Sequence, residues 1–578
     1  MAQQTDMIDD LKLFEFFNQL LEEGQIYIFE NSDSENINIS KEIFQILKEG
    51  YYHRLFEEIG IDLNGSYPES ENCRLSIKQI FQILWEISQP GKSLIICHKI
   101  KVKLLNAIWS RFIRKAILLL RNKDPRDKGK YKSDLGVTSL TDYFNEFSNF
   151  EELLFGADER QREHILHVFR VFLLGVFLVM NKEQYNFSVK VDMGYENEDE
   201  FYGFEAIENP YCSILDSTEI HEFKLEDSEK FAIWTLIALT HDLGYPLEKL
   251  DKINQRVLNI MTFFGSSNFY GLRYNLPLQG QFLNDYILRF ISSKLVFDES
   301  NELFYPQIQA KYYTKFSNAF EKLSHGIISC ILLMKNLVYF LESDFSFPET
   351  KVVLKKEEDA RQFSIRRDIL RAIASHDCDD IYHIRVNNFP FLLKICDELQ
   401  EWDRPIARDR FLPEIGSIVQ IQNFTTNTVE FSIEIKQPST DYVDFVKKKV
   451  ERFIRLFRSG VDSEKRPFSF SMTLKKIPEE KNDGVTSEET EVANSDVNSD
   501  APGENSASNE DAPSANEVII SSENFKKELH NSIEFCLTFP PIPQPFPEGE
   551  LYEPPKLSMK TADGKFGEDV LELLLDIN

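Results

Sequence analysis

The chain has few cysteines and little positive charge for its length. Its seven cysteines are scattered over 578 residues without any Cys-x-x-Cys pair, which argues against both a disulfide framework and a zinc ribbon. Lysine and arginine number 65 against 95 aspartates and glutamates, so the net charge is -30. Such a chain repels phosphate backbones and anionic lipid surfaces unless a local basic patch intervenes. We therefore expect neither general nucleic-acid binding nor membrane binding.

Long apolar runs are also missing. The longest, 171–180 and 231–240, reach about half of what a helix needs to cross a bilayer, so we expect buried helices there. The first residues, MAQQTDMIDDLKLFEFF, are acidic where a signal peptide is basic, and no small-residue cleavage site follows an apolar stretch. Together with the scattered cysteines, these absences predict a cytoplasmic protein.

Apolar residues, by contrast, are abundant. They make up 42% of the chain, and 48 residues are phenylalanine. This is enough apolar mass for a globular protein despite the overall charge. The length of 578 residues exceeds what one hydrophobic core usually organises. We therefore expect two or three folding units.

The spacing of the apolar residues divides the chain into three predicted regions. Over 1–150 and 151–410 they recur every three or four residues, which predicts helices and a mainly α protein. Over 411–578 the spacing alternates, which predicts a small α/β domain. Its expected elements are strands at 416–424, 427–436, 466–476 and 531–539 and an amphipathic helix at 441–457.

Three polar segments are predicted to be irregular. The stretch 181–227 is punctuated by glycine and predicts an insertion loop. The stretch 478–517 holds twelve acidic residues and one lysine amid Ser, Asn, Ala and Pro, and this composition cannot bury enough surface to fold. It predicts a disordered acidic linker. Asp377 lies in a short polar loop, where we expect a solvated turn residue.

Four polar residues interrupt the predicted helices of the middle region. His167 occurs in HILHVFRVFLLG, His241 and Asp242 end LIALTHDLGYP, and Asp397 lies in LLKICDELQEW. Carboxylates within apolar helices are costly unless they are paired or bound to a metal. A single histidine in such a place is ordinarily a hydrogen-bonded core residue. Imidazoles and carboxylates that converge from several rigid helices, however, suit a divalent cation, so the four together predict a metal site.

These residues occur in the order of a histidine, a His-Asp doublet at a helix end and a distant aspartate. This order resembles the signature of the HD superfamily of metal-dependent phosphohydrolases. The resemblance covers residues 151–410 and implies a helical HD-type core there. It further implies that His167, His241, Asp242 and Asp397 are the metal ligands.

Three more histidines bear on this assignment. His164 is the alternative for the first ligand. Val171 and Gly175 favour His167 instead, because they match the residues usually found after the first histidine in the family. His325 and His376 lie between the doublet and the last aspartate, where two-metal members of the superfamily place further ligands. Their other interpretation is substrate binding. We expect one or two divalent ions, of Mn, Mg, Fe, Co, Ni or Zn.

Three residues near the motifs are candidates for binding a phosphate. Gln400 and Arg404 follow Asp397 at helical spacing, and Lys249 lies seven residues beyond Asp242. We expect Lys249, Gln400 and Arg404 to bind substrate, since a guanidinium or ammonium can hold a phosphate oxygen. We expect Asp242, Lys249 and Arg404 to be catalytic. The ordinary alternative is a solvated helix face or a surface salt bridge.

The resemblance implies a phosphohydrolase that cuts a nucleotide or a small phosphodiester by attack of a metal-bound hydroxide. The chain departs from the HD-GYP branch, which acts on cyclic dinucleotides, because it has no adjacent His-His pair and its 244–246 Gly-Tyr-Pro directly follows the doublet. The alternative is a non-catalytic sensor of nucleotide or metal whose flanking regions relay occupancy to a protein partner or a second copy. A nuclease is disfavoured because no basic cluster flanks the motifs.

Overall fold

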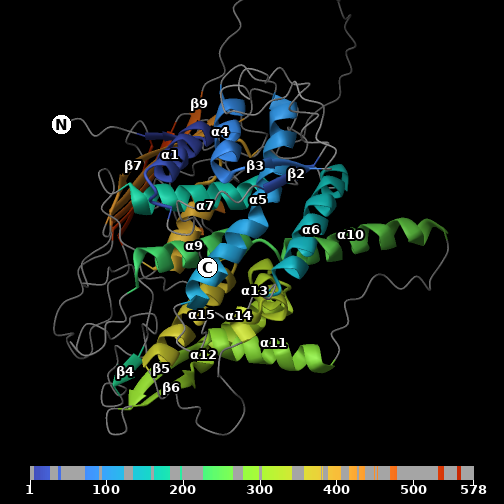
Figure 1. Ribbon diagram of the computed structural model, residues 1–578, viewed down its shortest axis with the longest axis vertical. Coiled ribbons are helices and arrows are strands. Elements are labelled where there is room, and N and C mark those ends of the chain that lie inside the picture. The colour runs from blue at the N-terminus through green and yellow to red at the C-terminus, as the bar shows by residue number, and fades with distance from the viewer. Residues whose placement is uncertain are drawn as a thin grey trace, which may run out of the picture.

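The computed structural model describes a helical body and one large sheet (Figure 1). The described residues are 6–26, 37–40, 72–89, 94–122, 135–157, 162–181, 195–197, 225–264, 278–298, 303–341, 357–378, 381, 388–404, 416–425, 428–436, 448–449, 452–453, 469–477, 532–538 and 556–561.

Most of the described residues are helical, which confirms the prediction of a mainly α protein. The helices are α1 (Asp10–Glu22), α4 (Ile77–Ile87), α5 (Leu94–Asn122), α6 (Val137–Ala157), α7 (Ile165–Met180), α9 (Asp227–Thr240), α10 (Tyr245–Met261), α11 (Leu278–Ile291), α12 (Ala310–Glu321), α13 (His325–Asn336), α14 (Val338–Leu341), α15 (Glu357–His376) and α16 (Phe389–Leu399), with a 3-10 turn at Thr262–Phe264. None of the described helices is long and apolar enough to cross a membrane.

Helix α7 runs through the centre of the helical body and packs against α1, α5, α9 and α16. It is apolar on almost every side, and its residues from Ile165 to Leu178 are buried. Gly175 allows α9 to approach closely, since a Cβ there would lie 2.1 Å from the ring of Trp234. The indole Nε1 of Trp234 donates to the carbonyl of Phe172 at 2.9 Å. These contacts hold the middle of α7 against α9 inside the body.

Side-chain caps mark the starts of two helices that lead to the predicted ligands. Before α9, Glu226 and Glu229 form a reciprocal capping box. Before α16, Asn388 accepts a hydrogen bond from the backbone N–H of Phe391 at 2.9 Å. These local signals explain where each helix begins.

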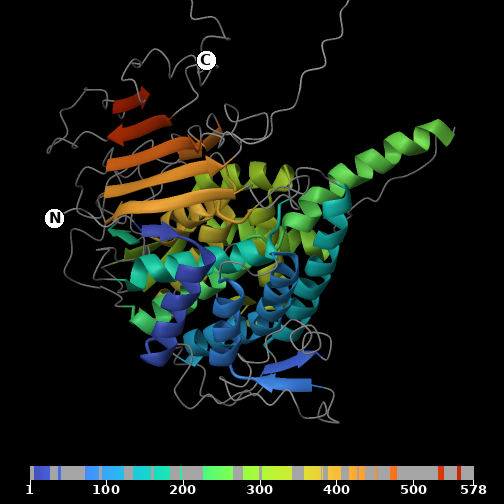
Figure 2. The same ribbon diagram turned by 90° about the horizontal axis from the view of Figure 1, so that it is seen from above.

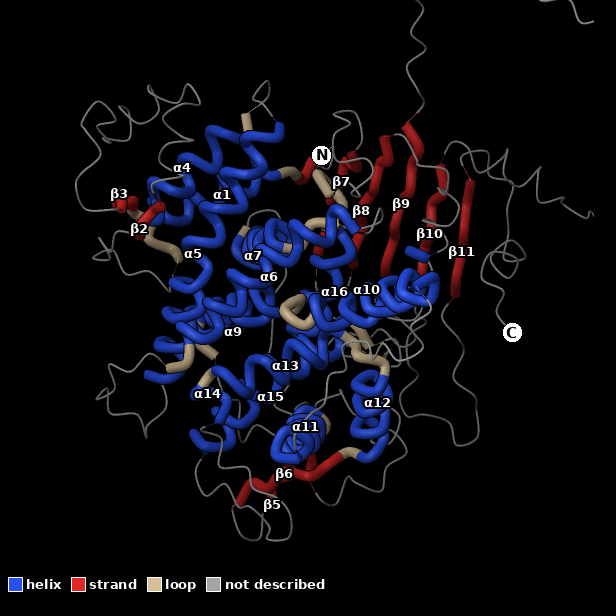
Figure 3. Tube along the Cα trace, turned by 90° about the vertical axis from the view of Figure 1, so that its right-hand side faces the viewer, coloured by secondary structure: helices blue, strands red, loops and turns tan. Residues whose placement is uncertain are grey.

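The large sheet has six strands in the order β1-β7-β8-β9-β10-β11 and lies beside the helices (Figures 2 and 3). Its strands are β1 (Asp6–Ile8), β7 (Gly416–Phe424), β8 (Thr428–Lys436), β9 (Ser469–Ile477), β10 (Ser532–Thr538) and β11 (Lys556–Thr561). β8 and β9 are parallel, and the other neighbours are antiparallel. The four strands predicted for the C-terminal region are confirmed as β7 to β10.

The N-terminal strand β1 pairs with β7, so the beginning of the chain extends the C-terminal sheet. This pairing was not predicted, because three residues carry too little alternation to indicate a strand. In the predicted amphipathic helix, residues 448–449 and 452–453 are described and are helical. Phe453 packs against Phe431 and Phe470 of the sheet, with ring centroids 5.7 and 4.7 Å apart. This helical segment therefore lies against one face of the sheet.

Two small sheets complete the described strands. β2 (Ile37–Ser40) pairs with β3 (Asn72–Leu75), while β4 (Tyr195–Asn197), β5 (Ser293–Asp298) and β6 (Leu303–Ile308) form a three-stranded sheet. β4 falls within the predicted insertion loop, and most of that loop lies outside the described residues. The predicted acidic linker also lies outside them.

One hydrophobic cluster joins the three predicted regions. It includes Ile8 and Phe17 from the first region, Phe172 from the second, and Val419 and Phe431 from the third. The sheet and the helical body therefore share buried apolar surface.

Candidate metal centre

The predicted ligands lie at the ends of five helices, α7, α9, α13, α15 and α16, each of which packs against at least one other of the five. The positions are the first turn of α7, the residues directly after α9, the first residue of α13, the last residue of α15 and the last turn of α16. They carry, in this order, His167, His241 with Asp242, His325, His376 and Asp397.

Asp242 lies at the middle of this cluster and is 4% exposed. Its Oδ2 lies 3.6 Å from Nε2 of His167 and 3.5 Å from Nε2 of His241. Its Oδ1 lies 3.3 Å from Nε2 of His325 and 3.6 Å from Nε2 of His376. The two carboxylate oxygens therefore face two different pairs of histidines, as a carboxylate that bridges two ions would.

The half of the cluster on the Oδ2 side, which we call the first half, also contains Asp397. Its Oδ1 lies 3.0 Å from Nε2 of His167. The ligand atoms of His167, His241 and Asp397 all lie within 4.8 Å of one another. Ligand bonds of about 2 Å leave neighbouring ligand atoms about 3 Å apart, so this group can hold one divalent ion.

The half on the Oδ1 side, the second half, is built by His325 and His376. Their Nε2 atoms lie 3.1 Å apart. His376 also groups with His241 and Asp242 as possible ligands to one ion. Two imidazole nitrogens that face each other at this distance need a proton or a cation between them.

The remaining ring nitrogen of each histidine in the first half is held by a neutral acceptor. Nδ1 of His167 lies 2.6 Å from Oε1 of Gln400, and Nδ1 of His241 lies 2.8 Å from the carbonyl of Ala238. An acceptor at Nδ1 places the proton there and leaves the Nε2 lone pair facing the cluster. Nε2 of His241 is buried and has no hydrogen-bond partner among the described residues. A bound cation would satisfy this atom, which is otherwise costly to bury.

In the second half the two histidines differ in the partner of this nitrogen. Nδ1 of His376 lies 2.6 Å from the carbonyl of Ile373. Nδ1 of His325 lies 2.8 Å from Oε2 of Glu248 and 2.9 Å from Oδ2 of Asp377. Two carboxylates thus orient His325 so that its Nε2 faces Asp242.

Protonation states in the first half match what metal binding requires. Burial lowers the pKa of His241 to about 4, and burial together with the charge of Arg404 lowers the pKa of His167. Burial opposes the charged form of Asp242, but His241 and the hydrogen bonds from two further histidines hold its pKa well below the usual range. For Asp397, burial is likewise outweighed by His167, and its pKa is well below the usual range. Neutral imidazoles and anionic carboxylates are the metal-ligating forms.

His325 is the exception. Burial alone would lower its pKa, but the charge of Asp377 and the hydrogen bonds to Asp242 and Glu248 raise it well above the usual value. Without a metal, His325 therefore carries a proton at neutral pH. In turn, His325 outweighs the burial of Asp377 and lowers the pKa of that carboxyl.

Of the two alternatives for the first ligand, the structure brings His167 into the cluster. The Nδ1 of His164 instead lies 2.8 Å from Oε1 of Glu151. The ring of His164 packs on Tyr245, with centroids 3.7 Å apart, and burial lowers its pKa to about 3. His164 is therefore a neighbour of the cluster, held by a buried glutamate.

Glu248 and Asp377 are site residues that the sequence analysis missed. Asp377 was expected to be a solvated turn residue, and it does lie in a turn and is partly exposed, but its carboxylate is also held by contacts within the site. Its Oδ2 accepts hydrogen bonds from the Ser324 hydroxyl at 2.9 Å and the backbone N–H of His325 at 3.1 Å. One signal was present, because His376 and Asp377 form a second His-Asp doublet at a helix end. Glu248, in the first turn of α10, carried no such signal.

The three predicted phosphate-binding residues have different surroundings. Helix α16 ends at Leu399, so the helical spacing expected to place Gln400 and Arg404 beside Asp397 does not continue. The carboxamide of Gln400 is fully buried, with Oε1 on His167 and Nε2 donating to the carbonyl of Trp402 at 2.9 Å. Gln400 thus orients His167, and its side chain has no exposed surface for a substrate.

The two cationic candidates lie near the cluster. Nζ of Lys249 lies 4.8 Å from the ring centroid of Tyr245, the residue on which His164 packs. The positive charge of Arg404 contributes to the lowered pKa of both His164 and His167. Both side chains are half-buried.

A glycine explains how the doublet and α13 approach each other. A Cβ on Gly244 would lie 2.2 Å from the carbonyl of His325. The N–H of Gly244 donates to the hydroxyl of Ser329 at 2.8 Å, and that hydroxyl lies 2.7 Å from the carbonyl of His241. Only glycine leaves room for this contact between the two halves of the centre.

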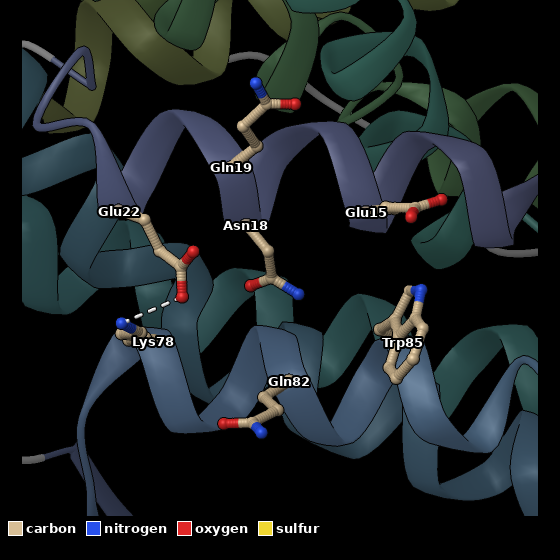
Figure 4. Close-up of a pocket in the computed structure, with 7 residues that line it drawn as sticks. All are labelled: Glu15, Asn18, Gln19, Glu22, Lys78, Gln82 and Trp85. Atoms are coloured by element: carbon tan, nitrogen blue, oxygen red, sulfur yellow. Dashed lines mark ion pairs between the residues drawn. The ribbon is translucent and has the colours of Figure 1, made fainter.

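A separate groove of about 320 Å³ lies on the surface between α1 and α4 (Figure 4). Lys78 and Glu22 form an ion pair across it at 3.0 Å. Its lining is polar apart from one tryptophan and contains none of the predicted site residues; it consists of Glu15, Asn18, Gln19, Glu22, Lys78, Gln82 and Trp85.

Comparison of the chain with protein-family models, with curated protein sequences and with solved structures found no significant match.

Proposed function

We propose that the chain is a metal-dependent phosphohydrolase of the HD type that acts on a nucleotide or a small phosphodiester. The observation that supports this most is the position of Asp242, whose two carboxylate oxygens face two histidine pairs. One or two hydrogen-bond donors would be enough to stabilise a buried structural aspartate, whereas four imidazole Nε2 atoms surround this one. The unpartnered, buried Nε2 of His241 supports the same proposal.

The donor set fits two divalent ions. His167, His241 and Asp397 would hold the first ion. His325 and His376 would hold the second, and the carboxylate of Asp242 would be shared between the two ions. Carboxylate and imidazole ligands suit Mn, Fe, Co, Ni or Zn. When bound, such ions supply hydroxide near neutral pH and stabilise charge on the phosphoryl oxygens.

The protein's own groups have three tasks in this proposal. Gln400 holds the Nδ1 proton of His167 and so keeps its Nε2 free for ligation. Asp377 and Glu248 perform the corresponding task for His325. The half-buried cations Lys249 and Arg404 would bind the phosphate, and the net charge of -30 on the chain favours a small substrate over a polynucleotide.

The proposal includes a cytoplasmic location, which fits the free, buried thiols of Cys330, Cys378 and Cys396. A sensor that binds metal and nucleotide without turnover would use the same ligands. Turnover therefore decides between the two functions.

The test begins with metal analysis of the purified full chain. It continues with a screen of nucleoside mono-, di- and triphosphates, dinucleotides and an aryl phosphodiester, with Mn²⁺, Mg²⁺, Co²⁺ and Ni²⁺ added. Hydrolysis in oxygen-18 water should put one solvent oxygen into the phosphate product, with no covalent phospho-enzyme. Label found only in the other product would mean carbon-oxygen cleavage and would exclude the proposed mechanism. Metal binding without turnover of any substrate would favour the sensor.

A further inference from the structure

The last two residues of α16 and the four that follow them form what we call the α16 exit segment (398–403). One side of this segment contacts the candidate metal centre. The segment directly follows Asp397, and its Gln400 orients His167. Gln400 has left the helical conformation, with φ −74° and ψ 79°, and a second hydrogen bond from its side chain to Trp402 holds it there. The path of this short segment therefore determines how two residues of the first half are placed.

On its other side the exit segment contacts Lys449. Nζ of this lysine lies 2.7 Å from the carbonyl of Glu398, 2.8 Å from its Oε2, and 2.7 Å from Oε1 of Glu401. These three acceptors match the three donors of an ammonium group. Lys449 is 5% exposed, Glu398 1% and Glu401 7%. The two carboxylates lie on either side of Gln400 in the sequence.

Lys449 does not belong to the helical body. It lies between β8 and β9 in the helical segment that packs on the large sheet, and Phe453, one turn further on, contacts Phe431 of β8 and Phe470 of β9. The sheet thus reaches the exit segment through the buried ammonium group of Lys449, and Arg452 of the same segment adds a more exposed contact, with its Nη1 3.0 Å from Oε1 of Glu398.

The charges around the ammonium group of Lys449 determine what its removal would do. Burial opposes the charged form of Glu398, but Lys449 and Arg452 lower its pKa to about 2. For Glu401, burial is outweighed by Arg162 and Lys449, and its pKa is also about 2. Buried ion pairs contribute little net stability compared with apolar packing, yet the loss of one partner leaves a buried charge that must move. Here the charge that moves would carry the exit segment with it.

We propose that Lys449 is a positioning residue of the metal centre, through which the C-terminal sheet sets the affinity of the first half for its ion. This inference rests on the proposed function. It predicts an unequal effect: the ion held by His167, His241 and Asp397 should bind more weakly without Lys449, whereas the ion held by His325 and His376 should not.

The test compares Lys449→Met with Lys448→Met in the full chain, since Lys448 is the exposed neighbour of Lys449. Both variants and the wild type are titrated with Mn²⁺ by calorimetry, and circular dichroism checks that the helices are retained. We expect Lys449→Met to weaken one of two Mn²⁺ ions, the one that Asp397→Asn also weakens, by several-fold, which is less than the about tenfold or more that loss of a direct partner of a ligand causes. We expect the second ion, and both ions in Lys448→Met, to bind as in the wild type.

If Lys449→Met does not fold, Glu401→Gln is the decisive variant. The glutamine side chain has nearly the same size as glutamate but removes one of the two negative charges beside the ammonium of Lys449. Its first ion should bind several-fold more weakly. Unchanged Mn²⁺ affinity in a folded Lys449→Met chain, or in Glu401→Gln, overturns the inference and leaves the proposed function intact. Equal weakening of both ions also overturns it, because that result indicates general destabilisation. If the wild type binds no Mn²⁺, the proposed function fails and this inference fails with it.

Discussion

The two halves of the candidate centre differ at one histidine, His325, whose ring nitrogen Nδ1 has charged partners where the histidines of the first half have neutral ones. In the first half, the Nδ1 atoms of His167 and His241 face an amide and a backbone carbonyl. Neither partner is charged, so burial dominates and lowers the pKa of both rings. In the second half, Nδ1 of His325 faces the carboxylates of Glu248 and Asp377, and its pKa is raised.

The pKa of His325 is raised by the charge of Asp377 and by hydrogen bonds to Asp242 and Glu248, whereas the buried rings of His167 and His241 have no carboxylate at Nδ1. The first half already has the neutral imidazoles that an ion requires. The second half holds a proton on His325 where its ion would bind, and that proton must leave first. We therefore expect the first ion to bind more tightly and with less dependence on pH.

The largest effect is expected from Asp242→Ala, because this residue serves both halves. The variant should lose both ions and all hydrolytic activity while it keeps its helices, as judged by metal analysis and circular dichroism. Asp285→Ala, which removes a partly exposed partner of Arg289, is the matched control. Full metal content in the Asp242→Ala chain would show that this site is not the metal centre.

Asp397→Asn should sharpen the comparison, because it changes the first half alone. It removes a ligand charge next to His167 but leaves the cations expected to bind the phosphate. We expect kcat to fall more than about 100-fold, the larger loss seen for an outer partner of a ligand, while substrate affinity changes little. Steady-state kinetics and equilibrium binding, measured side by side, separate the two. A change confined to KM would contradict the assignment.

The pH dependence of metal binding should differ between the halves. Below the raised pKa of His325, a proton competes with the second ion, so each unit of falling pH should weaken that ion about tenfold. The first ion should hold its affinity until the pH approaches the value of about 4 that burial gives to His241. Mn²⁺ titrations at about pH 6 and about pH 8, within the ordinary range of histidine titration, test this. Parallel slopes for both ions would contradict it.

The proton on His325 also predicts how stability depends on pH in the metal-free chain. Because the folded pKa is raised above that of the unfolded chain, this group stabilises the fold fully below about pH 6.5. The contribution is lost as the pH rises through the folded value. Thermal unfolding in the presence of a chelator should show this loss, and His325→Gln should remove it.

The smallest effect is expected from deletion of 478–517. Its composition predicts that it does not fold, and the residues that remain between β9 and β10 are enough to connect two antiparallel neighbours. Neither half should change its Mn²⁺ affinity, and the segment should be the first to be cut by protease. Loss of either ion on deletion would show that this segment contributes to the centre.

The sequence by itself determined the helices, the four C-terminal strands and the residues that converge on Asp242. Apolar periodicity, caps and turn residues act within a few positions along the chain, and polar residues inside apolar helices stand out without any structure. His167 and Asp397 were identified in this way although 230 positions separate them.

Only the tertiary structure decided what surrounds those residues. The amide of Gln400 on His167, the carboxylates around His325 and the ammonium of Lys449 under the α16 exit segment are contacts between elements far apart in sequence. Gln400 was expected to bind substrate, and Asp377 was expected to be solvated. Their contacts with the histidines were missed because helical spacing and loop polarity say nothing about which element packs opposite a residue. The protonation of a buried histidine depends on that opposing element, since a few ångströms of distance to a carboxylate outweigh the cost of burial.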